Sequence, residues 1–376
     1  MMDTGSGLVW LPSKGCGTNC SQGLPADAGF DASASSTFHS VGCDNPSCNA
    51  SFCQECACST SQPGSCGYSL EYMEGGTAFG AWVQDSLQLP ALVLADTASA
   101  SLKFGLQQGT TGDLQQQNIH ALIGLNSEPT SLVSQLAAGR TIEDGFSYCL
   151  DDVGHHLLVL GVPRNESGSE LDFQFLPLLM RNNSNPQRRQ DMYLVELTAL
   201  ELGSAGSVPA PKLPIAANAS LSMAMVDSGT SLLALPPAMA QAFGEVVLTA
   251  AKQAHLPLNA SVTDGICFQG VTINEAAVAL PPLTFVFGNS VNVTVPADNY
   301  LAPAPGWDAP CVAVEPSSTE FPMLGAKPLQ KVAVAVRNSK QSLGFKRVRR
   351  CIDLVEFQGP DKLTSFLGRA ENAVAA

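Results

Sequence analysis

The chain has 376 residues, enough for two domains, and 45% of them are hydrophobic, which is ample for two buried cores. Its formal net charge of -14 argues against a nucleic-acid partner. No run of about 18 apolar residues occurs, so no membrane span is expected.

The first motif along the chain is Asp3-Thr4-Gly5-Ser6, and it returns almost unchanged in the second half as Asp227-Ser228-Gly229-Thr230. Each copy is followed by apolar residues. One such tetrad alone would be typical of an ordinary capping turn. Two copies with matching flanks indicate a duplicated chain that carries one acidic turn in each half.

Two such turns facing each other would bring the carboxylates of Asp3 and Asp227 close together. Like charges at short range share one proton, so one carboxyl group can act as an acid while the other acts as a base. The base can deprotonate a water molecule held between them, and the acid can protonate the carbonyl oxygen that this water attacks. The hypothesis needs no covalent intermediate, metal or cofactor.

A cysteine-rich region follows the first motif. Eight of the twelve cysteines lie between Cys16 and Cys66, among many Gly, Ser and Pro residues. An even number in an oxidising compartment predicts a surface excursion held by disulfides. A zinc knuckle on Cys53 and Cys56 is the competing interpretation, which the lack of a His at ligand spacing disfavours. The pairing inside this cluster stays open.

Sequons for N-glycosylation also indicate the secretory pathway, with an extracellular or vacuolar destination. Their asparagines are Asn19, Asn49, Asn165, Asn182, Asn218, Asn259 and Asn292.

Most of the chain is predicted to form short strands, for example at 81–89 and 283–287. Helices are expected at 131–138 and from Pro236-Pro237 toward His255, because proline is favoured in the first helical turn. We therefore expect an all-β protein of two lobes with few short helices. The lobes are placed at 1–180 and 181–351, with an exposed connection at 181–191 and a loosely ordered tail at 352–376.

These motifs resemble those of pepsin-type aspartic endopeptidases, in particular the nepenthesin-like branch of plants and algae. The resemblance covers Asp3 to about Cys351. It includes a hydrophobic-hydrophobic-Gly motif for each catalytic loop and several stretches typical of the branch. These are Leu122-Ile123-Gly124, Met323-Leu324-Gly325, 131–136, 146–150, 193–195, 296–300 and 344–345. The resemblance implies the bilobal pepsin-like fold, with two six-stranded-barrel-like lobes and a cleft between them, and a monomer that acts on polypeptides.

The resemblance also implies roles for individual residues, with Asp3 and Asp227 as the catalytic pair. It assigns loop-locking and carboxylate-orienting roles to Thr4, Gly5, Ser6, Ser228, Gly229 and Thr230. It places a flap over the substrate cleft in the hairpin at 66–76, and assigns to that site Tyr72, its hydrogen-bond partner Trp10, and the turn residues Gly75 and Gly76. It further implies disulfides between Cys149 and Cys351 and between Cys267 and Cys311.

Some residues depart from the family pattern. Gly7 replaces a usual Asp, and in the flap Met73, Glu74 and Gly76 replace a usual Gly, Asp and Ser. The strand and the Gly-Thr-Pro turn that usually precede the first loop are missing, as is a signal peptide, so a chain shortened at its N-terminus is expected.

Two functions remain in competition. The first is an aspartic endopeptidase working at acidic pH. The second is a pepsin-fold binding protein of weak or no activity, similar to plant inhibitors of cell-wall glycosidases. The two intact acidic loops favour the enzyme. A serine hydrolase is disfavoured because no Gly-x-Ser-x-Gly surrounds Ser228, and the pair His155-His156 is expected to be a solvated turn.

Overall fold

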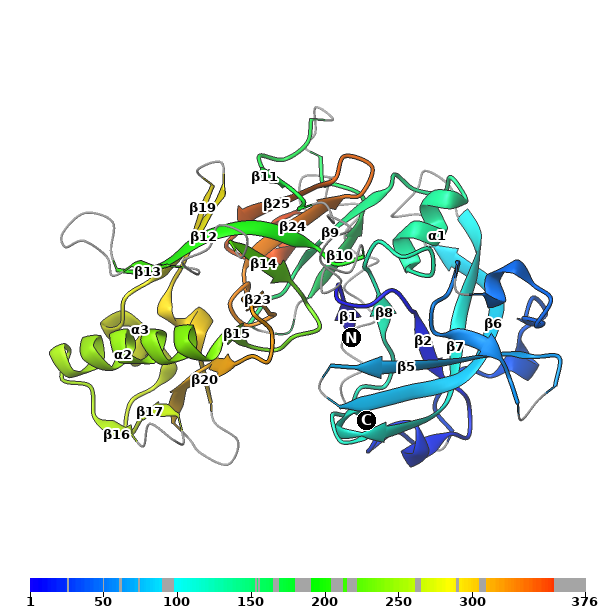
Figure 1. The fold of residues 1–376 in the computed structure, drawn as a ribbon, viewed down its shortest axis with the longest axis horizontal. Helices are drawn as coiled ribbons and strands as arrows, with labels where there is room; N and C mark the ends of the chain where they lie inside the picture. The colour runs from blue at the N-terminus through cyan, green and yellow to red at the C-terminus, as the bar shows by residue number, and fades with distance from the viewer. Residues whose placement is uncertain are drawn as a thin grey trace. The chain divides into compact units, whose positions relative to one another are not determined.

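The computed structural model describes residues 1–354 except 26, 50, 61–62, 74, 90–97, 153, 155, 165–168, 180–190, 204–211, 215–221, 261–264, 289–290 and 304–308. The chain forms two compact units (Figure 1). The first comprises Met1–Gly145 with Arg189–Met192, and the second comprises Phe146–Arg188 with Tyr193–Ala376. Residues 146–180, which the sequence analysis places in the first lobe, thus group with the second unit. The expected connection, apart from Asp191, and the tail beyond 354 lie outside the described residues.

The first unit is built on a six-stranded sheet. The described strands of this unit, inside and outside the sheet, are β1 (Met2–Asp3), β2 (Trp10–Pro12), β3 (His39–Ser40), β4 (Cys56–Cys58), β5 (Cys66–Tyr72), β6 (Gly76–Leu89), β7 (Ala98–Gly112) and β8 (Ile123–Gly124). Its helices are η1 (Gly17–Asn19), η2 (Ala32–Ala34), η3 (Pro46–Cys48), η4 (Asp113–Gln115) and α1 (Leu132–Ala138). The sheet has the order β2-β7-β6-β5-β4, with β3 paired to β6, while β1 and β8 form a separate parallel pair.

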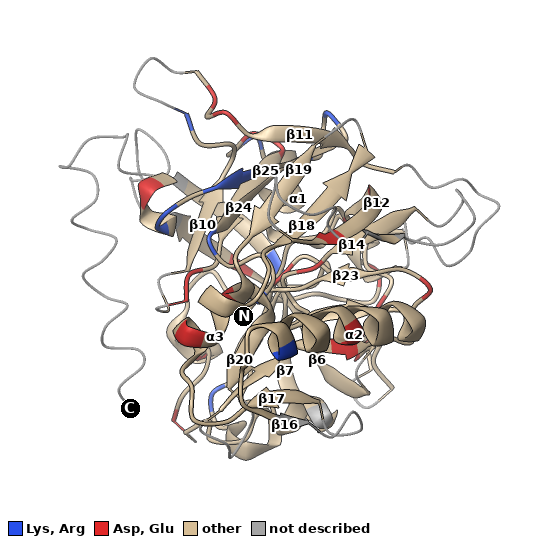
Figure 2. Ribbon diagram, turned by 90° about the vertical axis from the view of Figure 1, so that its left-hand side faces the viewer, with Lys and Arg blue, Asp and Glu red and all other residues tan. Residues whose placement is uncertain are grey.

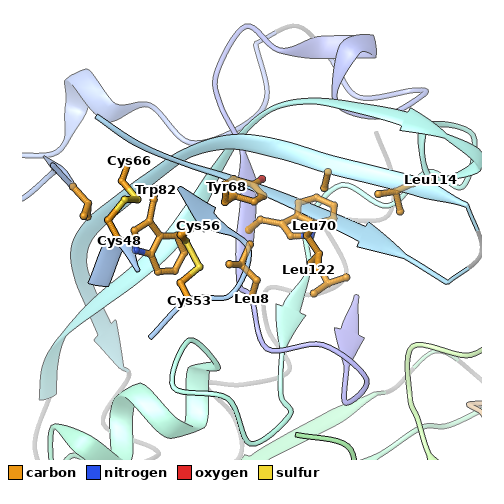
Figure 3. Close-up of a cluster of buried hydrophobic side chains, with 13 residues drawn as sticks. Leu8, Cys48, Cys53, Cys56, Cys66, Tyr68, Leu70, Trp82, Leu114 and Leu122 are labelled. Carbon is orange, nitrogen blue, oxygen red and sulfur yellow. A yellow bond between two sulfur atoms is a disulfide. The ribbon is translucent and has the colours of Figure 1, made fainter. Parts of the chain in front are cut away.

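Alternation of buried and exposed residues explains how this sheet covers a core. In β5, Tyr68 and Leu70 are buried while Ser69 and Glu71 are exposed, the period of two that a half-buried strand requires. The buried face packs on a cluster that includes Leu8 and Trp82. Figure 3 shows this cluster together with the disulfides Cys48–Cys66 and Cys53–Cys56. The cysteine-rich excursion is therefore attached to the core of the first unit.

The second unit contains three sheets among its described residues. Its strands are β9 (Gly145–Cys149), β10 (Leu157–Leu160), β11 (Gln174–Pro177), β12 (Leu194–Leu202), β13 (Lys212–Pro214), β14 (Met223–Val226), β15 (Leu233–Leu235), β16 (Leu258–Ala260), β17 (Ile266–Phe268), β18 (Leu283–Phe287), β19 (Asn292–Val295), β20 (Leu301–Pro303), β21 (Pro310–Val312), β22 (Val314–Pro316), β23 (Met323–Leu324), β24 (Val332–Arg337) and β25 (Ser342–Arg347). The sheet orders are β19-β18-β12-β14-β23-β15-β22, with β13 on β12, then β10-β9-β24-β25-β11, and β16-β17-β21-β20.

Helices of the second unit are α2 (Pro237–Gln253), α3 (Ile273–Ala279), η7 (Ala297–Tyr300) and η8 (Cys351–Leu354). α2 begins after Pro236, as predicted, and α3 begins with a capping box in which the Thr272 and Glu275 side chains satisfy each other's backbone N–H groups. The expectation of a mostly β protein with few short helices is confirmed.

Acidic and basic residues both occur at many places along the ribbon (Figure 2). Two of the basic residues near the end of β25 have acidic partners, because Lys346 pairs with Asp172 and Arg350 lies 2.8 Å from Asp353, while Arg347 donates to the Thr294 carbonyl oxygen at 2.6 Å. These acidic partners reduce the local positive charge, which makes the segment a poor phosphate-binding surface. No helix among the described residues is long and apolar enough to span a membrane.

Candidate active site

The Asp3 loop starts where β1 ends. β1 runs parallel to β8, with Asp3 paired to Gly124, and the Leu125 N–H donates to the carbonyl oxygens of Asp3 at 2.8 Å and Ser6 at 3.0 Å. Gly124 lies under the loop so closely that a Cβ on it would be 2.6 Å from the Leu8 nitrogen. The glycine of the Leu-Ile-Gly motif is therefore needed for the loop to pass over the strand.

The carboxylate of Asp3 is held by its own loop. Its Oδ1 accepts the Gly5 N–H at 2.8 Å, and its Oδ2 accepts the Ser6 hydroxyl. Asp3 is only 4% exposed. Both oxygens thus have a donor within three residues, so the loop itself helps to orient the carboxylate.

The Asp227 loop repeats this construction in the second unit. β14 runs parallel to β23, with Val226 paired to Leu324, and the Asp227 N–H donates to the Leu324 carbonyl at 3.1 Å. A Cβ on Gly325 would lie 2.6 Å from the Thr230 carbonyl oxygen. Each acidic loop therefore passes over a glycine at the end of the parallel neighbouring strand.

The carboxylate of Asp227 has the same two kinds of donor. Its Oδ1 accepts the Gly229 N–H at 2.9 Å and its Oδ2 accepts the Thr230 hydroxyl at 2.7 Å. Asp227 is 9% exposed. Thr4 and Ser228, the residues expected to lock the loops, are both buried next to their aspartates. The meeting of the two carboxylates and the locking role stay predictions.

The flap tyrosine and its indole partner do lie together in the first unit. The Trp10 Nε1 donates to the Tyr72 hydroxyl at 2.8 Å. Burial raises the pKa of Tyr72 well above its ordinary value, while hydrogen bonds with Trp10 and Ser6 act in the opposite direction. The hydroxyl therefore stays protonated at any working pH, and through Ser6 it connects to the donor set of Asp3.

The end of the hairpin that holds Tyr72 is tightly packed. Gly75 has a φ of 86°, a conformation that favours glycine. Gly76 pairs with Gly112 on β7, and a Cβ on it would lie 2.6 Å from the Leu114 Cβ. The usual serine would not fit at position 76 without displacing Leu114. Met73 is 65% exposed at this end of the hairpin, and Glu74 lies outside the described residues.

The structure contains both disulfides that the family resemblance implies, Cys149–Cys351 and Cys267–Cys311. Within the cysteine-rich excursion the pairs are Cys16–Cys20, Cys43–Cys58, Cys48–Cys66 and Cys53–Cys56. The sulfur atoms of Cys43, Cys48 and Cys58 lie within 4.8 Å of one another because two of these disulfides are neighbours. Cys53 and Cys56 bind each other, so they do not offer the thiolates that a zinc knuckle needs.

The sequons occupy several environments. Asn19, Asn49 and Asn292 are exposed. Asn259 lies in β16, and its side chain is not described, while Asn165, Asn182 and Asn218 lie outside the described residues.

Sequence reasoning missed a residue that supports the Asp227 loop from outside. Asn299, in a stretch recognised only as typical of the branch, donates from Nδ2 to the carbonyls of Pro328 at 3.1 Å and Gln330 at 2.8 Å. Pro328 and Gln330 lie in the turn that follows Ala326. The Ala326 N–H donates to the Thr230 carbonyl oxygen at 2.7 Å, which joins this turn to the Asp227 loop. The only signal for this role was the position of Asn299 inside a family stretch.

Comparisons with known proteins identify the relatives of this chain. Residues 1–162 match the family described as "Xylanase inhibitor N-terminal", and residues 192–347 match "Xylanase inhibitor C-terminal". Aspartic proteinase 39 of Arabidopsis thaliana is 29% identical over 80% of this chain, and nepenthesin-2 of Nepenthes gracilis is 27% identical over 85%. The chain spans 59% and 66% of the lengths of these two relatives.

A solved structure shares the fold. The crystal structure of basic 7S globulin from soybean superposes with a TM-score of 0.64 at 20% identity, covering 94% of this chain and 90% of the globulin chain. Together with the two family matches and the paired loops, these likenesses lead to one conclusion: the chain belongs to the pepsin-type aspartic proteinase family, in its nepenthesin-like plant branch.

Proposed function

We propose that this protein is an aspartic endopeptidase that hydrolyses polypeptides at acidic pH, with Asp3 and Asp227 as its catalytic pair. The observation that carries the proposal is the shared construction of the two loops. Each carboxylate accepts one N–H from the glycine two residues later and one hydroxyl from the residue after that. Such donor sets hold each carboxylate in a fixed orientation, and the recurrence of the same set in both halves of the chain supports a paired role.

The reaction follows from the pair holding one proton. The ionised carboxylate takes a proton from a bound water molecule, whose oxygen attacks the peptide carbonyl carbon while the protonated carboxyl group donates to the carbonyl oxygen. The resulting tetrahedral diol collapses as the C–N bond breaks: the leaving nitrogen takes a proton from one carboxyl group, and a diol hydroxyl gives its proton to the other, which releases the carboxylic acid and restores the single proton of the pair. Tyr72, fixed by Trp10, would close over the bound peptide and limit access of other water.

The second candidate is a pepsin-fold binding protein with weak or no activity. It is supported by the matching family descriptions, which name a xylanase inhibitor, and by the altered flap around Met73 and Gly76. A binder of this kind would keep the fold and present its surface loops to a partner. Its carboxylate loops, however, would be under no requirement to keep matching donors.

The proposal includes a secreted or vacuolar monomer. The support comes from the disulfides, which persist in oxidising compartments, and from the exposed sequons at Asn19, Asn49 and Asn292.

Cleavage of an unfolded protein substrate, at about pH 3 to 5, tests the proposal. The wild type should cleave and be inhibited by pepstatin, while Asp3→Asn and Asp227→Asn should each lose activity by several orders of magnitude. Asp44→Asn, at an exposed carboxylate of the first unit, is the matched control and should keep full activity. Cleavage that persists in Asp227→Asn would refute the site, and a folded wild type that binds a glycosidase without cleaving peptides would support the second candidate.

A further inference from the structure

The space beside the Asp3 loop is filled by side chains from another segment. Gly7 lies in this loop four residues after Asp3. A Cβ on Gly7 would lie 2.6 Å from the Asn126 Oδ1 and 2.7 Å from the Glu128 Cβ, and closer still to the Glu128 Oε2. The place that a side chain at position 7 would take is therefore occupied by Glu128 and Asn126.

These two side chains are fixed where they lie. Glu128 is 8% exposed, its N–H donates to the Asn126 Oδ1 at 2.9 Å, and its Oε2 accepts the Thr130 hydroxyl at 3.4 Å. The Asn126 Nδ2 donates to the Asp191 Oδ2 at 3.2 Å. A carboxylate is costly to bury, so its position against a glycine of the candidate catalytic loop calls for an explanation.

The same segment also holds the backbone of the loop. The Leu125 N–H donates to the carbonyls of Asp3 and Ser6, and the Asn126 N–H donates to the Ser6 carbonyl at 3.1 Å. Backbone hydrogen bonds thus fix residues 3 to 6, while Gly7 has no side chain of its own to limit its movement. Gly124 lies against the backbone of Gly7, and Glu128 fills the space on the side where a Gly7 side chain would be.

We propose that Glu128 is a positioning residue for Asp3: its side chain fills the space at Gly7 and so restricts the loop that carries the carboxylate. The effect on catalysis rests on the function proposed above, whereas the effect on the loop does not. Glu128 acts through Gly7 and the loop backbone, without touching the substrate. Glu128 acts through the volume of its side chain, so glutamine, which has nearly the same size, should restrict the loop equally well.

Three variants of the full chain test this role. Glu128→Ala empties the space, Glu128→Gln keeps its volume, and Gly7→Ala forces a methyl group into it. Asp85→Ala is the matched control, because Asp85 is also an 8% exposed carboxylate of the first unit but binds Ser35 and Thr37 instead. Two readouts are needed: kcat and KM per active site from pepstatin titration, and hydrogen exchange by mass spectrometry over residues 3–10.

Glu128→Ala is expected to lower kcat by about 10-fold to 100-fold with little change in KM, because small displacements of a reacting group have effects of this size. Gly7→Ala should lower kcat similarly. Both should exchange amides faster over residues 3–10, while Glu128→Gln and Asp85→Ala should match the wild type in both readouts.

Three outcomes would overturn the proposal: unchanged exchange over residues 3–10 in Glu128→Ala, equal losses in the Ala and Gln variants, or the same local effect in Asp85→Ala. A wild type without peptidase activity would refute the proposed function alone, since the exchange measurement still decides the role of Glu128. If Glu128→Ala fails to fold, Glu128→Gln and Gly7→Ala carry the same comparison.

Discussion

The Trp10 indole donates a 2.8 Å hydrogen bond to the Tyr72 hydroxyl, joining the strand that follows the first acidic loop to the end of the flap. Trp10 is fully buried, so its N–H has no access to water if the hydroxyl is removed. This bond fixes the position of the tyrosine ring from the side of the core.

Tyr72→Phe is therefore expected to lower the free energy of unfolding by about 1 to 2 kcal/mol, because a buried donor loses its partner. It should also lower kcat/KM, since the flap loses its fixed closing position. Chemical denaturation and peptide-cleavage kinetics measure the two effects. Tyr300→Phe, which removes a hydroxyl that donates to the Pro281 carbonyl at 2.6 Å, should destabilise the protein without lowering kcat/KM.

Thr230 offers a second test, because it is the hydroxyl donor to the Asp227 Oδ2. Thr230→Val keeps the side-chain shape but removes the donor. A hydrogen bond to a charged group contributes about 1.5 to 3 kcal/mol, so kcat/KM should fall by roughly 10-fold to 100-fold. Thr230→Ser retains the hydroxyl and should stay within a few-fold of the wild type. Equal activity in the Val and Ser variants would contradict the orienting role.

Asn299 is expected to support the Asp227 loop through the turn that it anchors. Asn299→Ala removes two hydrogen bonds and leaves the carbonyls of Pro328 and Gln330 without that donor. The free energy of unfolding should fall by about 2 kcal/mol. Thermal and urea unfolding measure this change, with Gln253→Ala at the exposed end of α2 as a control that should be neutral. A loss in the control as large as in Asn299→Ala would contradict the specific role.

The stability of the second unit should depend on Asp152 in a defined pH window. A hydrogen bond with Asp151 and the ion pair with Lys331, at 2.7 Å, lower the pKa of Asp152 to about 2, from 3.8 in the unfolded chain. A depressed carboxyl pKa contributes stability above the unfolded value, and that contribution is lost as the pH falls through the folded value.

Melting temperatures of the wild type and Asp152→Asn should accordingly differ at pH 5 and converge as the pH falls from about 4 to about 2. Calorimetry at several pH values measures this difference. A gap that stays constant down to pH 2 would show that the ion pair is not its origin. At the acidic pH proposed for activity, the Asp152–Lys331 pair should still be largely intact.

Local patterns in the sequence predicted the elements well. Ser131 caps α1 by accepting the Ser134 N–H, and α2 begins at Pro237 and ends at Gln253, near the expected limits. The acidic tetrads and the two glycine motifs lie at the ends of the strand pairs β1–β8 and β14–β23, a pairing that the sequence analysis did not predict. The helix limits were predictable because each is encoded within a few neighbouring residues.

Features that depend on distant partners were not predictable from one sequence. β9 and β11 lie in the region assigned to the first lobe, but β9 pairs with β24 and β11 pairs with β25. The local sequence pattern of 146–177 does not indicate these partners. The contact of Glu128 with Gly7 joins residues with no common motif, and the four disulfides of the excursion had several possible pairings.

The pairing of β9 with β24 sets an order of events during synthesis. β9 has left the ribosome long before β24 and β25, which lie at 332–347, so the hairpin of β9 and β10 must wait with one edge unpaired. The disulfide between Cys149 and Cys351 closes only after nearly the whole described chain has emerged. The sheet of the second unit therefore cannot be completed until β24 and β25 have been synthesised, and the unpaired edge of β9 is exposed to aggregation in the interval.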